Sequence, residues 1–178
     1  DAPVTASTTG GELTAAAYNV YYTYVKKDGT YVVESNPSPS SNITIAGSAI
    51  TVAVIALTDP DVTHIRIYRT LYSEPGADAY LEMEVNNATA THTLVLADDI
   101  IGDGAVLEYN HDRPVTGKFV IGAGSRLWLI DTNGLLHWSI LNYPEYMPGA
   151  NQQSFDPKDG DETMGMCALR SNLLVFKR

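Results

Sequence analysis

Short runs in which apolar residues alternate with polar ones, separated by turn residues, constrain this chain more than any other feature. In the run from Tyr80 to Val85, Leu81, Met83 and Val85 lie on one side and the residues between them on the other. The same two-residue period recurs in most of the runs, whereas no long window shows the 3.6-residue period of an amphipathic helix. The sequence therefore predicts an all-β chain of antiparallel strands.

Seven strands are expected in the first part of the chain, at the roughly 8–12-residue spacing typical of sandwiches and barrels. Their ranges are 15–26, 30–35, 42–46, 49–57, 63–71, 79–85 and 91–97. Asp28-Gly29 predicts a hairpin because Gly adopts positive φ without a steric penalty, and the prolines at 37 and 39 cannot donate to a ladder. Residues 1–12 are interpreted as a linker or an edge strand, and the only segments open to a helical interpretation are a turn near 59–62 and a short piece near 98–101.

A change of character at 102–117, where Gly, Pro and mixed charge gather, indicates a domain boundary. We therefore expect an immunoglobulin/fibronectin III-like antiparallel sandwich at 13–110, a linker at 111–117 and a second β region at 118–178. The expected elements of the second region are strands at 118–122, 126–131 and 135–139, a long polar loop at 142–162, and an apolar stretch at 164–178 broken by a turn at 170–172.

Three strands joined by tight hairpins and followed by a long connection are typical of a β-propeller blade. The second region is therefore interpreted as a partial propeller-like region, the opening of a propeller or a small β-domain. A propeller repeats this unit four or more times, and about one and a quarter units are present, so the repeat itself is not demonstrated.

Composition restricts the functional classes. The chain has 178 residues, is 44% hydrophobic, and carries a net charge of −10 with a pI near 4.6. Nucleic-acid affinity depends on clustered Lys and Arg, so scattered basic residues in an acidic chain argue against a phosphate-binding surface. The single cysteine, Cys167, excludes an intrachain disulfide, and no apolar run approaches the roughly 18 residues of a membrane helix. The chain starts without Met and stops in an apolar run, so a fragment of a longer polypeptide is expected.

Few residues are arranged for chemistry. Four carboxylates, those of Asp156, Asp159, Asp161 and Glu162, fall within seven residues, and calcium loops combine such a density of oxygen ligands with a Gly. The full spacing of a calcium loop is not met, so a calcium site and a solvated acidic loop both remain open. The four His residues lack the i, i+4 spacing of a helical zinc site, and no nucleophile motif is present. We expect no catalytic residue and no cofactor.

Tyrosine is abundant, with 11 residues in the chain. In the first Tyr-rich run, Tyr18, Tyr22 and Tyr24 share one side of the expected strand and Tyr21 lies on the other. Cross-strand packing explains such residues, but Tyr is also favoured at protein interfaces. The candidate interface residues are Tyr21, Tyr22, Tyr24, Tyr143 and Tyr146.

Two groups of segments resemble one class of protein. The first comprises YNVYYTYVKKDGTYVVESNPSPS, AITVAVIAL, HIRIYRT and AYLEMEV, and it resembles fibronectin type III-like modules in large structural proteins of tailed bacteriophages. The second comprises RLWLIDTNGLLHWSILNYPEYMP and GDETMGMCALRSNLLVFKR, and it resembles the propeller-like region that often follows such modules. The matching positions of the second group are Arg126 to Leu129, Trp138-Ser139, Pro144 to Tyr146, Gly160-Asp161 and Leu173 to Phe176.

The resemblance covers most of the chain, from residue 13 to residue 178, and implies a bacteriophage virion protein of the tail or neck. Proteins of this nozzle, adaptor or fibre-attachment type act by shape and docking, and the family carries no catalytic residues to transfer, so the chain is not expected to be an enzyme. The expected partners are other copies of the chain, in a homo-oligomer, and neighbouring virion proteins. Neither nucleic-acid sequence recognition nor a membrane span is expected.

Two alternatives remain open. A carbohydrate-binding or adhesion module of a bacterial surface protein would be favoured by an aromatic platform in a concave face and by calcium in the 156–162 loop. A fragment of a propeller glycosidase would be favoured by a central pocket that holds carboxylates of raised pKa.

Overall fold

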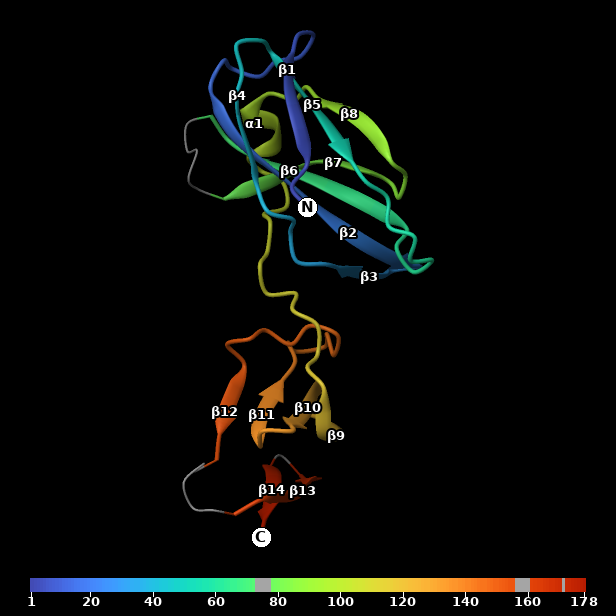
Figure 1. Cartoon of the computed structure of the whole chain (residues 1–178), viewed down its shortest axis with the longest axis vertical. Helices are drawn as coiled ribbons and strands as arrows, with labels where there is room; N and C mark the ends of the chain where they lie inside the picture. Colours follow the sequence, from blue (N-terminus) through green and yellow to red (C-terminus); the bar gives the residue numbers. More distant parts are fainter. Residues whose placement is uncertain (73–77, 156–160, 171) are drawn as a thin grey trace. The chain divides into compact units, whose positions relative to one another are not determined.

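A computed structural model describes residues 1–72, 78–155, 161–170 and 172–178. In these ranges the protein is all-β, as the alternating runs predicted, with antiparallel sheets and one short helix (Figure 1). The chain divides into two compact units, Asp1–Tyr109 (unit 1) and Asn110–Arg178 (unit 2).

Unit 1 contains two sheets in which every strand pair is antiparallel. The three-stranded sheet has the order β1-β5-β8, made of β1 (Val4–Thr8), β5 (Ala49–Val54) and β8 (Ala90–Leu94). The second sheet has the order β3-β2-β6-β7, made of β3 (Tyr31–Glu34), β2 (Ala17–Asp28), β6 (His64–Thr70) and β7 (Ala79–Asn86). Two further elements are β4 (Ser41–Thr44), which pairs with the first residues of β2, and the helix α1 (Asp98–Ile101).

All seven strands expected between residues 15 and 97 are present, with ends that shift by a few residues. β1 forms within residues 1–12, so the edge-strand interpretation of this segment is the one that holds. The two segments HIRIYRT and YNVYYTYV are direct neighbours, because β2 pairs with β6 from Val20↔Arg69 to Val25↔His64. Gly29 begins the two-residue loop between β2 and β3 with φ +60°, the conformation that only Gly adopts without cost in such a turn.

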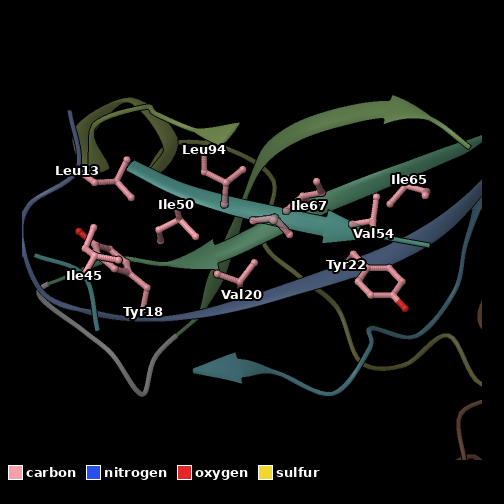
Figure 2. Close-up of a cluster of buried hydrophobic side chains, with 11 residues drawn as sticks. Leu13, Tyr18, Val20, Tyr22, Ile45, Ile50, Val54, Ile65, Ile67 and Leu94 are labelled. Atoms are coloured by element: carbon pink, nitrogen blue, oxygen red, sulfur yellow. The ribbon is translucent and has the colours of Figure 1, made fainter. Parts of the chain in front are cut away.

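One hydrophobic core is shared by the two sheets of unit 1. The inner residues of β2, Tyr18, Val20 and Tyr22, are buried, because they follow the two-residue period of the strand. Figure 2 shows these side chains in one cluster with residues of β5 and β6. The remaining buried members of the cluster are Leu13, Ile45, Ile50, Val52, Val54, Ile65, Ile67 and Leu94.

The order in which the chain visits the two sheets differs from that of an immunoglobulin constant domain. In that domain the first two strands share a sheet. Here β1 lies in the three-stranded sheet and β2 in the other. β1 also borders β4, with the hydroxyl groups of Thr5 and Ser41 2.8 Å apart, so the two sheets meet along this side of the unit.

A buried charge cluster closes one end of the core. Arg69 is fully buried and its Nε lies 2.5 Å from a carboxylate oxygen of Glu82, which is itself buried. A second guanidinium nitrogen of Arg69 lies 2.5 Å from Asp98 at the start of α1. Glu82 also accepts hydrogen bonds from the N–H groups of Val95 (2.7 Å) and Leu96 (3.0 Å). The cluster therefore ties the chain between β8 and α1 to β6 and β7.

Unit 2 contains a four-stranded antiparallel meander and a separate hairpin. The meander has the order β12-β11-β10-β9, made of β9 (Gly117–Ala123), β10 (Arg126–Asp131), β11 (Leu135–Trp138) and β12 (Gln152–Ser154). The hairpin consists of β13 (Thr163–Leu169) and β14 (Asn172–Lys177). Gly124 and Ser125 both have positive φ in the two-residue loop between β9 and β10, as a type I′ turn requires.

The expectation of one long polar loop at 142–162 was wrong in part, because β12 forms inside it. The three residues of β12 are polar and exposed, and they pair with Leu135 to His137 of β11. A three-residue edge strand without a buried side chain has no apolar alternation, so its strand character depends on the neighbouring strand and not on its own sequence.

Gly47 lies where the chain passes β1. A Cβ atom at this position would lie 2.0 Å from the carbonyl oxygen of Thr8, which is backbone and cannot rotate away. Gly47→Ala is therefore expected to displace β1 and to lower the free energy of unfolding of unit 1 by roughly 1–3 kcal/mol in urea titrations. Gly122→Ala is the control, because a Cβ there has no neighbour within 4 Å. Equal losses for the two variants would contradict the close approach.

Candidate docking surface

The hairpin β13–β14 exposes apolar side chains on one face. Cys167 lies opposite Leu174 in the register, and Leu169 and Phe176 are two residues away on their strands, so these four side chains share a face. We call them the hairpin face. Leu169 is 58% exposed, Leu174 38% and Phe176 51%. On the opposite face Met166 and Val175 are half-buried and Ala168 is exposed.

The outer edges of the hairpin form no ladder with a further strand in the described residues, although β13 packs beside β9. In the part of the chain that the structure describes, β13 and β14 form ladder hydrogen bonds with each other and with no further strand. An isolated two-stranded hairpin is marginally stable in water, and unpaired edges are templates for another strand. Exposed apolar residues grouped in this way mark interaction sites, so the hairpin face is the candidate docking surface.

Charge is divided unevenly between the two units. Unit 1 contains 14 acidic and 4 basic residues, whereas unit 2 contains 7 of each, so unit 1 carries the whole net charge of −10. Residues 163–178, which form the hairpin, include Arg170, Lys177 and Arg178 and no acidic residue. The sequence analysis did not predict this uneven distribution of charge. It becomes visible only when the charged residues are counted separately in each unit.

The three candidate tyrosines of β2 have different environments. Tyr22 is buried in the core, and its hydroxyl group donates to the carbonyl oxygen of Asp1 (3.0 Å). Tyr24 is half-buried on the same side and donates to the carbonyl oxygen of Ile55 (2.9 Å). Tyr21 points to the other side of the sheet, where its ring meets that of Tyr109 edge to face at 6.5 Å.

The two candidate tyrosines of unit 2 belong to one stack of rings. Tyr143 and Tyr146 stack at a centroid distance of 5.5 Å, and Tyr146 stacks on His111 at 4.2 Å. Tyr146 is buried, whereas Tyr143 at the end of the stack is exposed. Tyr143 is therefore the candidate interface tyrosine with the largest exposed fraction, and the others hold the fold together.

A polar ladder crosses the outer side of the sheet around Arg66. Arg66 donates to Glu34 at 2.5 Å and to Glu84 at 2.9 Å, and Glu84 also binds Lys27. Burial alone would lower the pKa of Arg66, but the two carboxylates outweigh burial and raise it. Tyr68 donates to Glu34 at 2.5 Å, and burial together with this hydrogen bond raises its pKa. These groups neutralise one another and stabilise the pairing of neighbouring strands.

The proposed calcium ligands are described in part. Asp156 and Asp159 lie outside the described residues. Of the other two, Glu162 lies 2.5 Å from Nζ of Lys118, which lowers the pKa of its carboxyl group. Asp161 and Glu162 line a hollow of about 330 Å³ together with Lys118 and Lys177. Among the described residues no group of three or more His, Cys, Asp or Glu side chains could hold a metal ion.

Two further hollows lie on the surface of the described residues. One lies beside His64 and His92 in unit 1, and the other lies beside Arg126 and Asn142 in unit 2. Neither of these hollows, nor the one at Glu162, is lined by Trp or Tyr. They do not form the aromatic platform that a sugar-binding module would need.

Asp131 stabilises the turn between β10 and β11. One carboxylate oxygen accepts hydrogen bonds from the N–H groups of Asn133 (2.8 Å) and Leu135 (2.9 Å), and the other lies 3.3 Å from Nε2 of His137. Burial alone would raise the pKa of Asp131, but these hydrogen bonds outweigh burial and lower it. The folded state of unit 2 therefore favours the charged form of the Asp131 carboxyl group over the protonated form.

The stability of unit 2 is expected to fall in acid because of Asp131. Its folded-state pKa lies below the unfolded value, so its contribution is present above the unfolded pKa and is lost as the pH falls through the folded one. Asp131→Asn should lower the free energy of unfolding by about 1–2 kcal/mol at pH 7 and by less at pH 3. Urea titrations at the two pH values measure this. Glu162→Gln, which alters a fully exposed pair, is the control, and an equal loss from Asp131→Asn at both pH values would contradict the prediction.

Comparison with protein-family models, curated proteins and solved structures gives no match. Among the described residues, no helix combines the length and the apolar character needed to cross a membrane.

Proposed function

We propose that the protein is a structural component of a tailed-bacteriophage virion, in the tail or neck, and that it acts by docking to neighbouring subunits. The observation that carries this proposal is the hairpin face, which leaves Leu169, Leu174 and Phe176 exposed on a hairpin that forms no ladder with a further strand in the described residues. A hairpin of this size gains stability when further strands or another subunit cover it. In an assembly, the neighbouring subunits cover such a hairpin.

The proposal includes a finer assignment of the two units. Unit 1 is a sandwich of the fibronectin III type, which is supported by the hydrophobic core that its two sheets share. Unit 2 opens a propeller, which is supported by the meander β9 to β12, because a propeller blade is a four-stranded antiparallel sheet. β13 and β14 then belong to a second blade.

Docking fits the described residues better than catalysis. A glycosidase needs a carboxyl group whose pKa is raised so that it can act as a general acid. In the described residues the carboxyl groups with a resolved shift are Glu84, Asp131 and Glu162, and the pKa of each is lowered by its partners. These shifts are the signature of structural ion pairs and turn hydrogen bonds.

Incorporation into phage particles tests the proposal. Particles are assembled with wild-type chain or with the double variant Leu174→Asp and Phe176→Asp, purified, and analysed by quantitative mass spectrometry and immunogold labelling. The wild-type chain should be present in several copies at the tail or neck, and the variant should be at least about tenfold depleted because burying two charges without partners is costly. Leu57→Asp, a change at an exposed apolar residue of unit 1, is the control and should be incorporated normally. Absence of the wild-type chain from purified particles would refute the proposal.

A further inference from the structure

We infer that the hairpin face of one copy of the chain docks on an acidic, apolar surface of unit 1 in a second copy, in a head-to-tail contact. The inference rests on the proposed docking function and names the partner of the hairpin face. Two observations carry it: the uneven division of charge between the units, and an exposed segment of unit 1 whose chemistry complements the hairpin.

The acceptor is residues 99–109, which we call the acidic segment. Its acidic residues, Asp99, Asp103 and Glu108, are all exposed, and it contains no basic residue. The same segment contains three exposed large apolar residues: Ile100 at 55%, Val106 at 43% and Tyr109 at 62%.

The acidic segment is held in place by the rest of unit 1. Ile101 and Leu107 are buried and anchor it from beneath. Its backbone runs along β7, where Ala105 accepts a hydrogen bond from the N–H group of Leu81 (2.9 Å) and Leu107 donates to Ala79 (2.8 Å). A surface fixed in this way loses little conformational entropy on binding, which favours docking.

The two surfaces are complementary in both apolar character and charge. The hairpin offers Leu169, Leu174 and Phe176 with two nearby cations, Arg170 and Arg178, and the acidic segment offers three large apolar residues with three acids. A contact between two hairpin faces would instead bring Arg170 and Arg178 of each copy near the same cations of the other. Like charges across an interface cost free energy, so the head-to-tail contact is the favoured one. Repeated head-to-tail contacts generate a ring or a filament.

Mixing two half-disrupted variants of the full chain tests the contact. Variant H carries Leu174→Asp and Phe176→Asp, and variant S carries Ile100→Lys and Val106→Lys. Each is expected to sediment alone as a monomer at concentrations where the wild type associates, with Kd weakened at least roughly 30-fold. A 1:1 mixture should form a complex of two chains, because variant S keeps an intact hairpin face and variant H keeps an intact acidic segment. Circular dichroism and thermal unfolding of each variant establish that it is folded.

Three other results of these experiments would overturn the inference. If variant S alone still forms dimers, the hairpin faces bind each other and the inference is overturned. If the wild type stays monomeric up to about 100 μM, or if the mixture of H and S stays monomeric, head-to-tail self-association is overturned as well. In these cases incorporation into particles remains a separate measurement, so failure of the inference is distinguishable from failure of the proposed function.

Raising NaCl from about 0.1 to about 1 M should weaken the wild-type contact, because the Debye length falls from roughly 10 to 3 Å.

Discussion

Replacing Arg69 by Met is expected to lower the free energy of unfolding of unit 1 by about 3–5 kcal/mol, the largest effect of any substitution considered for this protein. The change leaves Glu82 charged, buried and without the guanidinium group that lies 2.5 Å away. It also removes the contact to Asp98, so α1 and the chain before it lose their attachment to β6. Urea titration monitored by far-UV circular dichroism measures the loss.

Arg66 provides a matched control for this prediction, because it lies three residues away on the same strand and also binds two carboxylates. Its side chain lies on the outer side of the sheet and is partly exposed, so solvent screens its ion pairs. Arg66→Met should therefore cost about 1 kcal/mol or less. If Arg69→Met costs no more than Arg66→Met, the cluster around Arg69 does not hold the end of the core as described.

Ile50→Ala is expected to lower the free energy of unfolding of unit 1 by about 2–5 kcal/mol. Ile50 belongs to β5 and is fully buried in the core between the two sheets (Figure 2), so truncation leaves a cavity among close-packed side chains. Thermal unfolding measures the loss as a lower Tm. Ile55→Ala is the control, because Ile55 follows β5 directly and is exposed, and its loss should be within about 0.5 kcal/mol of zero. Similar losses for the two variants would mean that the two sheets do not pack through β5.

The strands of unit 1 were predictable because each has a regular period and is bounded by residues with a clear turn chemistry. Gly29 shows this in unit 1 and Gly124 shows the same in unit 2, since both have the positive φ that a tight hairpin demands. β12 was missed because its three polar residues become a strand only through pairing with β11. The assignment of each strand to a sheet was also beyond the sequence, because it depends on long-range pairings such as β1 with β5.

The candidate surface was predictable in part. The sequence predicts an apolar strand at Leu173 to Phe176. Which of its side chains are exposed depends on the register with β13 and on what covers the opposite face of the hairpin. Arg69 shares the two-residue period of Ile65 and Ile67, so the sequence did place it on the core side of β6. Its partners, Glu82 and Asp98, come from other elements, and no local pattern indicates them.

The reactivity of Cys167 in the assembled and the free chain tests most directly whether the hairpin face is a docking surface. Cys167 is the single cysteine of the chain, lies opposite Leu174 on this face and is partly exposed, so a thiol reagent reports on this site alone. Labelling should proceed to one equivalent in the isolated chain at dilutions where it is monomeric and should slow at least about tenfold in particles that contain it, because the neighbouring subunit covers the face. Equal labelling rates in the free chain and in the particle would show that the hairpin face stays open in the assembly, and would contradict docking through it.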